Sequence, residues 1–422
     1  MKHIFLITTI CLFISCCKNL DTHSKSEVIK VESITGIVKN GQLAFASRYD
    51  TMSRDSDVAV DKNSLYQISS NTKKTTLSDI VNEEAQFFLE DKRFNALSIA
   101  VFDNGESYIG HYGEMDKGLG NKPTNKTLYE IASVSKTMTG YLVASAVEEG
   151  KLKLDDVIYD ILGTRYQNLQ YNGEPVRIKH LITHTSGLPL NIRGVSELYQ
   201  NPSSTSYKEA QKVLTNYSKE DLLLEVQSLK LTQKPGENYG YSNIAPNLIA
   251  HILEIVYSKS FEELLKEKLF IPAKMLNTCI NLNNEQKALL ANGYNENNEL
   301  MPNFKEPIQL WGAAGRIKSN SEDLLNYIKW QLNENNSIIK RSHEKLFHDV
   351  ENIWIGYYWE VIDRNVDDYI EHHGGIYGSQ NWIIIFPKQN VGVSIITNSS
   401  FPEANQLIKE TANKIINKIN YK

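Results

Sequence analysis

Strand-forming segments lie on both sides of a long helical region, and this order of elements limits the possible folds more than any other feature. Residues 97–103 and 106–112 are strand-like and flank Asn104-Gly105, a two-residue signal for a β-hairpin. Further strand-like segments are rich in Ile, Val, Tyr and Trp: residues 353–362, 368–372, 381–386 and 391–397. We therefore expect an α/β fold of the α+β type, in which helices flank an antiparallel sheet that carries an inserted, mostly helical region. The cleft between the two is the natural ligand site.

Helical patterns account for much of the remaining chain. Residues 79–91 have apolar side chains at helical spacing, and a helix from Ser133 to Glu149 ends at Gly150. Pro246 lies in the first turn of an apolar helix, and residues 260–263 form a capping box for the next one. Two further helices are expected at residues 322–332 and 404–419.

The N-terminus has the layout of a secretory signal. Met1-Lys2-His3 supplies a positive start, and residues 4–14 are apolar except for two threonines. A membrane-spanning helix needs roughly 20 apolar residues, so this segment is too short to be one. We expect residues 1–17 to be a signal peptide and the protein to be exported.

Ser15-Cys16 resembles the cleavage box of bacterial lipoproteins, in which a small residue precedes the acylated cysteine. Lipidation of Cys16 would anchor the protein to a membrane, facing the periplasm or the cell surface. Cys17 makes the acceptor ambiguous, and an ordinary cleaved signal or an uncleaved anchor is the alternative. Residues 18–76 are polar and fit a tether or a small N-terminal extension with a strand pair, so the folded domain is expected at residues 77–422.

Composition excludes several partners. The net charge is −5, and no Lys/Arg cluster stands out, so we expect no nucleic acid partner. Three of the four cysteines lie in the signal segment, which leaves only Cys279 and excludes an intramolecular disulfide framework in the mature chain. No Cys/His cluster has zinc spacing, and we expect neither a metal nor another cofactor.

The strongest chemical signal is Ser133-Val134-Ser135-Lys136 at the start of a helix. The i, i+3 spacing puts Ser133 and Lys136 on one helix face. A serine hydroxyl needs a base to become a nucleophile, and a lysine whose pKa is lowered by burial can supply one. The helix N-terminus also offers free N–H groups to an oxyanion. Taken alone, the pattern also fits a capped helix with an exposed lysine.

Two further segments strengthen the interpretation. Tyr241-Ser242-Asn243 follows a turn-like segment, and a tyrosine beside a lysine can relay a proton. His373-Gly374-Gly375 lies on or near an expected strand, where glycines let a ligand lie close to the backbone. Aromatic packing and a bend between strands are the respective alternatives.

Ser133-x-x-Lys136, Tyr241-x-Asn243 and His373-x-Gly375, in this order, resemble the motifs of the serine β-lactamase and penicillin-binding protein-like superfamily. The pattern is most similar to class C β-lactamases, D,D-peptidases and related esterases. Residues 181–189 and 312–316 support the resemblance, which covers the chain from about Leu77 to its end. It implies the β-lactamase/transpeptidase-like fold.

The resemblance also implies the residues' roles. Ser133 would attack a carbonyl and become an acyl-serine, while Lys136 and Tyr241 would shuttle its proton, with either as principal base. Asn243 would hold the substrate's amide or stabilise Lys136. The N–H groups of Ser133 and Ile376 would form the oxyanion hole, worth about 3 kcal/mol per donor. His184 and Thr185 would belong to a structural loop.

One departure from the family pattern bears on the substrate. The third motif usually begins with Lys and contains a hydroxyl, which together bind a substrate carboxylate. Here His373 and Gly374 stand in those places, so we expect weaker carboxylate recognition and favour an esterase or peptidase over a β-lactamase. Glu371 lies on the same expected strand face and could raise the pKa of His373.

Three functions therefore stay open. The first is an exported serine hydrolase of the esterase or peptidase type that acts on an ester or amide, with cell-wall material among its candidate substrates. A class C-like β-lactamase or D,D-carboxypeptidase is the second. The third is a non-catalytic module that binds peptidoglycan fragments, although such a module has no need of a nucleophile with its base.

Overall fold

This computed structural model describes the backbone of residues 33–39, 42–49, 51–53 and 56–59, and residues 75–199, 203–365 and 367–420 in full. The chain forms two compact units, Met1–Lys73 and Lys74–Lys422. In the first, β1 (Ser33–Lys39) pairs with β2 (Gln42–Tyr49), and β3 (Thr51–Ser53) pairs with β4 (Ser56–Ala59), both antiparallel. The expected signal segment and Cys16 lie outside the described residues.

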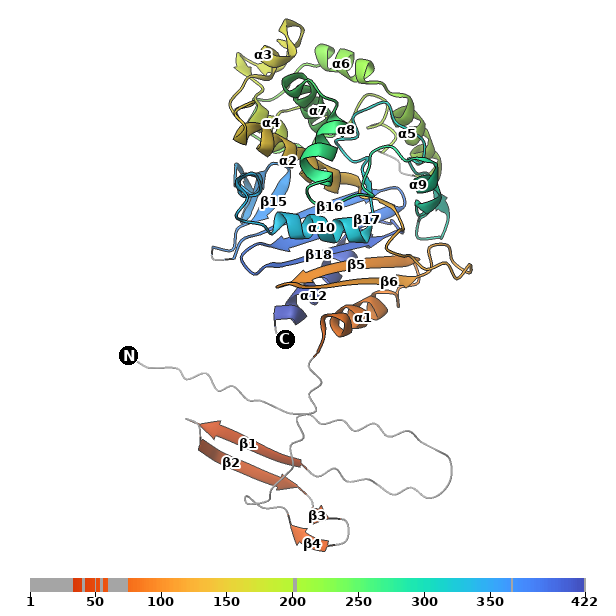
Figure 1. The fold of residues 1–422 in the computed structure, drawn as a ribbon, viewed down its shortest axis with the longest axis vertical. Helices are drawn as coiled ribbons and strands as arrows, with labels where there is room; N and C mark the ends of the chain where they lie inside the picture. The colour runs from red at the N-terminus through yellow and green to blue at the C-terminus, as the bar shows by residue number, and fades with distance from the viewer. Residues whose placement is uncertain are drawn as a thin grey trace, which may run out of the picture. The chain divides into compact units, whose positions relative to one another are not determined.

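An eight-stranded antiparallel sheet forms the centre of the second unit (Figure 1). Its order is β13-β14-β15-β16-β17-β18-β5-β6, so the C-terminal strands lie beside the N-terminal hairpin. The strands are β5 (Ala96–Asp103), β6 (Glu106–Gly113), β13 (Phe347–Val350), β14 (Ile353–Gly356), β15 (Trp359–Ile362), β16 (Tyr369–Ile376), β17 (Ser379–Phe386) and β18 (Val391–Thr397). Strand β18 pairs with β5 along its whole length. This pairing joins the strands before and after the helical insertion into one sheet. The predicted fold class is confirmed.

Helices cover both faces of the sheet, and this explains the uninterrupted apolar run at residues 382–386 of β17. Trp382 and Ile384 pack in a cluster under α1 (Leu77–Phe88) and α12 (Ala404–Asn420), whereas Ile383 and Ile385 pack in the larger core on the other face. A strand buried on both faces has no solvent side on which polar residues would alternate. Each such side chain contributes roughly 1.5–3 kcal/mol by leaving water.

The larger core lies between the sheet and the inserted helices. Helix α2 (Ser135–Glu148) is buried along most of its length and packs against α7 (Ile244–Tyr257) and α11 (Ser337–Ser342). The other inserted helices are α3 (Ile158–Leu162), η2 (Thr164–Tyr166), α4 (Ile178–Ile182), α5 (Ser204–Asn216), α6 (Lys219–Ser228), α8 (Phe261–Leu265), η3 (Lys266–Phe270), α9 (Asn284–Leu289) and α10 (Ser321–Gln331). Short strand pairs connect them: β7 (Tyr129–Glu130) with β12 (Lys318–Ser319), β8 (Gln170–Tyr171) with β9 (Glu174–Pro175), and β10 (Gly293–Tyr294) with β11 (Leu300–Met301).

One predicted strand is in fact a hairpin. Residues 353–362 form β14 and β15, joined at Tyr357-Tyr358, and both tyrosines have a positive φ. Tyrosine pairs favour strands, so no local signal marks this turn. Tertiary contacts hold this turn. The Tyr358 N–H donates to the Ile182 carbonyl at 2.9 Å. The Tyr357 carbonyl oxygen packs so closely against Gly140 of α2 that a Cβ on this glycine would lie 1.9 Å from it.

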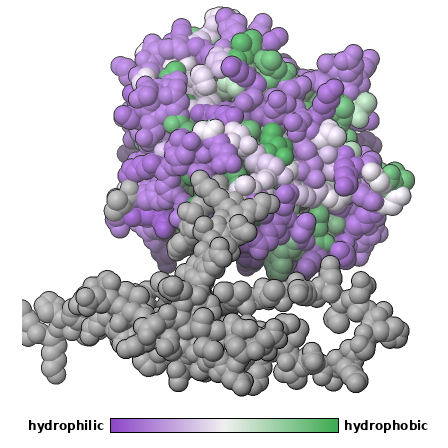
Figure 2. All heavy atoms as spheres, turned by 60° about the horizontal axis from the view of Figure 1, so that its bottom comes forward, coloured by the Kyte–Doolittle hydropathy of each residue, from purple (hydrophilic) through white to green (hydrophobic). Residues whose placement is uncertain are grey.

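The surface of this unit is mainly hydrophilic on the face in Figure 2, where apolar side chains occur in small separate groups. No helix within the described residues is long and apolar enough to cross a bilayer.

Candidate active site

Ser133 lies in a tight turn between β7 and α2. The turn is η1 (Ala132–Val134), and Ala132 adopts φ 46°, a left-handed conformation that non-glycine residues rarely adopt. Two contacts hold the turn against the sheet: the Asn381 side chain donates to the Ile131 carbonyl at 2.8 Å, and Gly374 of β16 packs against the same oxygen. Because Ser133 is in the first turn of a helical segment, its N–H has no carbonyl partner within the helix.

Lys136 is fully buried beside Ser133. Its Nζ donates to Ser133 Oγ at 3.0 Å and also to the carbonyl of Ala314. Burial, and then the positive charge of Arg316, lower the pKa of Lys136 well below its usual value. A neutral amine in hydrogen-bond contact with the serine is able to accept its proton.

Tyr241 approaches Ser133 from a separate loop. Its hydroxyl donates to Ser133 Oγ at 2.8 Å, and Lys136 Nζ lies 4.8 Å from the centre of its ring. Burial raises the pKa of Tyr241, so the phenol keeps its proton at neutral pH. Of the two candidate bases, the lysine is favoured because its pKa is lowered, and the tyrosine is suited to donate.

Residues 183–190, which follow α4, form the loop that holds the tyrosine segment. The His184 carbonyl accepts from Gly240 N at 2.7 Å, and its Nδ1 accepts from Ser242 N at 3.2 Å. The His184 ring lies 4.4 Å from that of Tyr241, and burial holds its pKa well below the usual value. Thr185 accepts from Gly236 N at 2.8 Å. These contacts position Tyr241.

Asn243 lies at the edge of the site rather than against the lysine. Its Nδ2 donates to Asn191 Oδ1 at 2.7 Å, and both asparagines line a cavity beside Ser133. The polar partners of Lys136 within the described residues are Ser133 and Ala314. Of the two roles left open by the sequence, the position of Asn243 fits contact with a substrate.

His373 does not face the catalytic groups. Its ring packs 5.2 Å from Trp382, on the sheet face that α12 covers, and its Nε2 bonds Gln380 Oε1 at 2.6 Å. Burial, opposed by the Gln380 bond, lowers its pKa, and Glu371 instead forms an ion pair with Lys409 at 2.7 Å. The hypothesis that Glu371 raises the pKa of His373 is therefore wrong.

His372 is the histidine on the catalytic side of β16. Neighbouring residues of a strand face opposite sides, so His372 shares its face with Gly374, which packs against the serine's turn. Burial lowers the pKa of His372 to about 3, and the charge of Lys136 contributes, so this imidazole is neutral. The sequence contains two consecutive histidines, and only the strand's orientation distinguishes them.

The open edge of β16 favours Gly375 over Ile376 as an oxyanion donor. Strand β15 pairs with β16 only from Tyr369 to Glu371, so beyond this point the edge is unpaired. A two-residue turn joins Ile376 to Ser379, and the closing pair of such a hairpin exchanges its hydrogen bonds. Alternation then directs the Gly375 N–H to the open edge beside Ser133.

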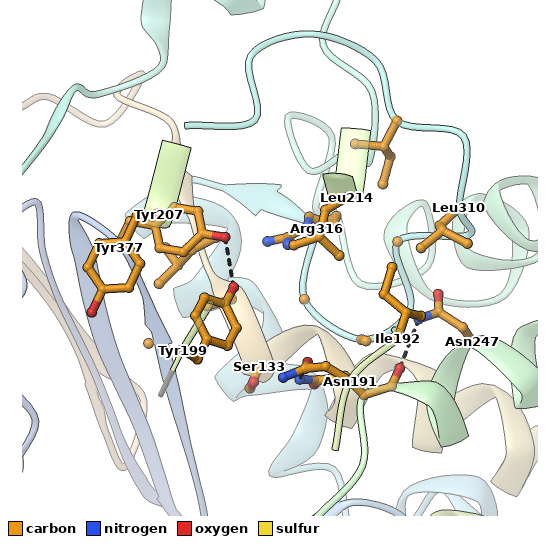
Figure 3. A pocket seen from close by; sticks show the side chains of 18 of the residues that line it. Ser133, Asn191, Ile192, Tyr199, Tyr207, Leu214, Asn247, Leu310, Arg316 and Tyr377 are labelled. Atoms are coloured by element: carbon orange, nitrogen blue, oxygen red, sulfur yellow. Dashed lines mark hydrogen bonds between the residues drawn. The ribbon is translucent and has the colours of Figure 1, made fainter. Parts of the chain in front are cut away.

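A cavity of about 470 Å³ opens at Ser133 (Figure 3). Polar and apolar side chains share its wall, and they include Asn191, Ile192, Tyr199, Tyr207, Leu214, Asn243, Ile308, Leu310, Arg316 and Tyr377. Of the residues that line the cavity, the sequence predicted Ser133, Asn243, Gly375 and Ile376 as site residues; the others come from loops far apart in the chain and were not assigned to the site individually. No group of three or more His, Cys, Asp or Glu in the described residues is placed to hold a metal ion.

Known proteins are similar to this chain in sequence. The family model described as Beta-lactamase matches residues 81–417. Protein flp of Staphylococcus aureus (strain MRSA252) is 26% identical over 332 residues, or 77% of this chain and 63% of flp, so the match spans less than two thirds of that relative. A protein named Beta-lactamase from Escherichia coli (strain K12) is 23% identical over 368 residues, which cover 77% of this chain and 90% of the relative.

A crystal structure of beta-lactamase/D-alanine carboxypeptidase from Yersinia pestis, complexed with citrate, has a TM-score of 0.69 to this structure at 23% sequence identity. The structural match covers 82% of this chain and 98% of the Y. pestis chain. The antiparallel sheet with its helical insertion thus defines a protein of the β-lactamase/transpeptidase fold. The chain belongs to the Beta-lactamase family, whose members are serine hydrolases.

Proposed function

We propose that the protein is an exported serine hydrolase that forms an acyl-serine on Ser133 and hydrolyses an ester or an amide. The contact between Ser133 Oγ and the buried Lys136 amine, 3.0 Å apart, carries this proposal. A pure binding module would gain nothing from a buried lysine of lowered pKa beside a serine, and its burial costs stability.

In the first step, neutral Lys136 takes the Ser133 proton as Ser133 Oγ bonds to the substrate's carbonyl carbon. The carbonyl electron pair moves to oxygen, where the N–H groups of Ser133 and Gly375 stabilise it, at about 3 kcal/mol per donor. When the intermediate collapses, the bond to the leaving group breaks and Tyr241 gives that group its proton. Lys136 then passes the proton it took from Ser133 to Tyr241, whose ring centre lies 4.8 Å from the lysine Nζ; Ser133 Oγ, now an ester oxygen, carries no proton.

A water molecule completes the reaction. It attacks the acyl-serine carbonyl and loses a proton to the same lysine–tyrosine pair. As the bond between the acyl carbon and Ser133 Oγ breaks, this pair, which contacts Oγ, returns a proton to the serine and the acid is released. Asn243, which lines the cavity, is suited to hold an amide or ester group of the acyl part.

An esterase or peptidase is the favoured activity. His372 and His373 both have lowered pKa values, so the third motif offers no cation to a substrate carboxylate at neutral pH. A class C-like β-lactamase or D,D-carboxypeptidase is the second candidate, and the names of the E. coli relative and the Y. pestis structure favour it.

Export and lipid anchoring rest on the sequence of residues 1–17. In a bacterial host, the full chain should be recovered with the membranes, and Cys16→Ser should release it. Because Cys17 adjoins Cys16, Cys17→Ser is the matched control, and we expect it to stay with the membranes. Release by Cys17→Ser alone would move the anchor to that residue.

Hydrolysis of a p-nitrophenyl ester and of a chromogenic cephalosporin tests the catalytic proposal. We expect wild-type protein to turn over the ester faster than the cephalosporin, and Ser133→Ala to lose both activities. Faster cephalosporin turnover would favour the β-lactamase alternative. Turnover that persists in Ser133→Ala would exclude this serine as the nucleophile.

A further inference from the structure

Arg316 places a positive charge in the wall of the cavity beside Ser133 (Figure 3). Its guanidinium lies 3.5 Å from the centre of the Phe304 ring, which supports one face of the group. The other cavity-lining residues are uncharged at neutral pH. Arg316 is therefore the cation that a molecule in this cavity meets.

No carboxylate in the described part of the chain forms an ion pair with Arg316. Glu130 is the candidate counter-ion, because the charge of Arg316 acts to lower its pKa. The Glu130 carboxylate is buried, however, and accepts a hydrogen bond from Phe304 N at 3.0 Å. Arginine is normally paired where it is partly buried, because its five donors lose water there. An unpaired guanidinium at a cavity wall is suited to an anionic ligand.

Tyrosines extend the polar wall next to this cation. The hydroxyls of Tyr199 and Tyr377 are hydrogen bonded at 2.7 Å, and the Tyr207 ring lies 4.9 Å from that of Tyr377. Arg316 is close enough to Tyr377 to act on its ionisation. The rest of the wall is apolar and contains Ile192, Leu214, Ile308 and Leu310. The cavity thus suits a molecule with an apolar part and an anionic end.

The cavity lies on the side of Ser133 to which the proposed reaction directs the acyl part of the substrate. Within the described residues, its lining includes Ser133 but neither Tyr241 nor Lys136. In the proposed reaction the leaving group takes its proton from Tyr241, so it departs on the tyrosine's side of Ser133. The acyl part then extends to the other side, where Arg316 lies.

We propose that Arg316 binds a carboxylate on the acyl part of the substrate, and that the natural substrate is an acyl compound with such a group. This inference rests on the proposed acyl-serine reaction and assigns its substrate class. The planar guanidinium matches a carboxylate with two parallel hydrogen bonds, as lysine cannot. The sequence suggested weak carboxylate recognition because the third motif has no lysine. In the structure, the cation beside Ser133 is Arg316, which comes from a different loop.

Paired esters test this assignment. p-Nitrophenyl monoesters of glutaric, adipic and pimelic acid would be compared with p-nitrophenyl pentanoate, hexanoate and heptanoate, which match them in length but end in a methyl group. We expect at least one acid to have a higher kcat/KM than its neutral partner. Arg316→Gln should lower that preference by roughly tenfold to a hundredfold, the usual range for a charge-assisted contact, and Arg316→Lys should lower it less.

The acid-to-neutral ratio is the decisive quantity. Arg316 also lowers the pKa of Lys136, so its replacement changes the rates of both esters, and this common effect cancels in the ratio. A ratio that Arg316→Gln leaves within twofold of wild type would overturn the assignment. An unchanged near-ultraviolet circular dichroism spectrum would show that the variant is folded.

Binding to Ser133→Ala separates this inference from the catalytic proposal. Calorimetry would compare monomethyl adipate with methyl hexanoate, neither of which that variant should hydrolyse. Selective binding of the acid, lost in the double variant Ser133→Ala/Arg316→Gln, would support the carboxylate site even if no ester is turned over. Equal binding of both compounds, or selectivity that survives the double substitution, would overturn it.

Discussion

The Lys136 amine lies 3.0 Å from Ser133 Oγ, and both residues come from one turn of helical chain. Their spacing in the sequence sets this contact, but its chemistry depends on distant residues. Burial under the rest of the core lowers the pKa of the lysine, and the Ala314 carbonyl fixes the direction of its amine. In the proposed reaction, Lys136 must therefore be neutral when the enzyme acts.

Replacement of Lys136 should abolish catalysis. Lys136→Met removes the base, and Lys136→Arg puts a permanently charged group in its place, so kcat/KM should fall by at least about a thousandfold in both. In wild type, kcat/KM should rise with pH through a pKa well below 10.5, because the neutral amine is the active form. A pH–rate profile checks this, and a rate that is highest with a protonated lysine would contradict it.

The same lysine should cost stability. The unfolded chain keeps this lysine protonated up to about pH 10.4, whereas the folded protein releases the proton at a lower pH. Between the two pKa values the unfolded state binds more protons, so the lysine's contribution becomes more favourable as pH rises. Lys136→Met should therefore raise the free energy of unfolding at pH 7 by about 1 kcal/mol, measured by urea denaturation.

Lys318→Met is the matched control for that stability gain. Burial lowers the pKa of Lys318 to about 8, but the nearby Glu130 carboxylate opposes this shift. Removal of Lys318 leaves Glu130 buried without this cation, so the free energy of unfolding should fall. Equal gains from both substitutions would show that lysine burial alone, and not the lack of a counter-charge at Lys136, sets the effect.

Tyr241→Phe should retain the fold and lose most of the activity. The substitution removes the hydroxyl that contacts Ser133 Oγ at 2.8 Å, and a lost proton donor lowers kcat by about a hundredfold or more. Burial raises the pKa of Tyr241, so the wild-type profile should show no fall from its ionisation near neutral pH. A rise in activity near neutral pH that Tyr241→Phe removes would show that the phenolate is the active form, and would contradict its assignment as a protonated phenol.

Two adjacent glycines should differ in their tolerance of alanine. A Cβ on Gly374 would lie 2.3 Å from the Ile131 carbonyl, so Gly374→Ala must push the serine's turn away from the sheet. On Gly375 the nearest atoms, at 2.9 Å, are the ends of the Gln380 and His373 side chains, which can move. Gly374→Ala should cost about 1–3 kcal/mol and most of kcat, and Gly375→Ala clearly less.

Gly240→Ala serves as the control, because its Cβ would meet only Gln233 Nε2, at 3.8 Å. Thermal unfolding and ester hydrolysis together would check the series. Similar losses from all three substitutions would contradict a specific contact between Gly374 and the turn.

Glu360 should make stability depend on pH. Burial and the charge of Glu371, directly opposite on β16, raise the pKa of Glu360 from 4.5 to about 7. The folded state then binds the extra proton between these values, so this contribution is complete below pH 4.5 and is lost as pH rises to 7. Glu360→Gln should be more stable than wild type at pH 8, by up to roughly 3 kcal/mol, and the difference should shrink towards pH 5. Denaturation at the two pH values measures it.

Local patterns predicted the parts of the fold that local interactions determine. The Asn104-Gly105 turn, the capping box at Ser260 and the helix after Pro246 depend on neighbouring residues, and the structure has each of them. The turn at Tyr357-Tyr358 depends on packing against Gly140, some 200 residues earlier in the chain, and no local pattern signals it.

The candidate site divides in the same way. Ser133 and Lys136 share a helical turn, so their spacing predicted their contact. The orientation of His372 and His373 depends on which face of β16 meets the serine's turn, which the sequence does not encode locally. Arg316 joins the cavity because its loop packs against that turn: a Cβ on Gly315 would lie 3.3 Å from Ala132. Such long-range contacts are visible only in the folded chain.

Mass spectrometry of the protein, quenched during turnover of p-nitrophenyl acetate, tests whether Ser133 is the nucleophile. We expect one acetyl group on the peptide that contains Ser133, and none in Ser133→Ala. Because neutral Lys136 must deprotonate Ser133 before the acyl-serine can form, the acetyl group should also be absent in Lys136→Met. A stable acetyl group on another residue would contradict Ser133 as the nucleophile. Turnover that continues without an acetyl group on Ser133, and that persists in Ser133→Ala, would contradict it as well.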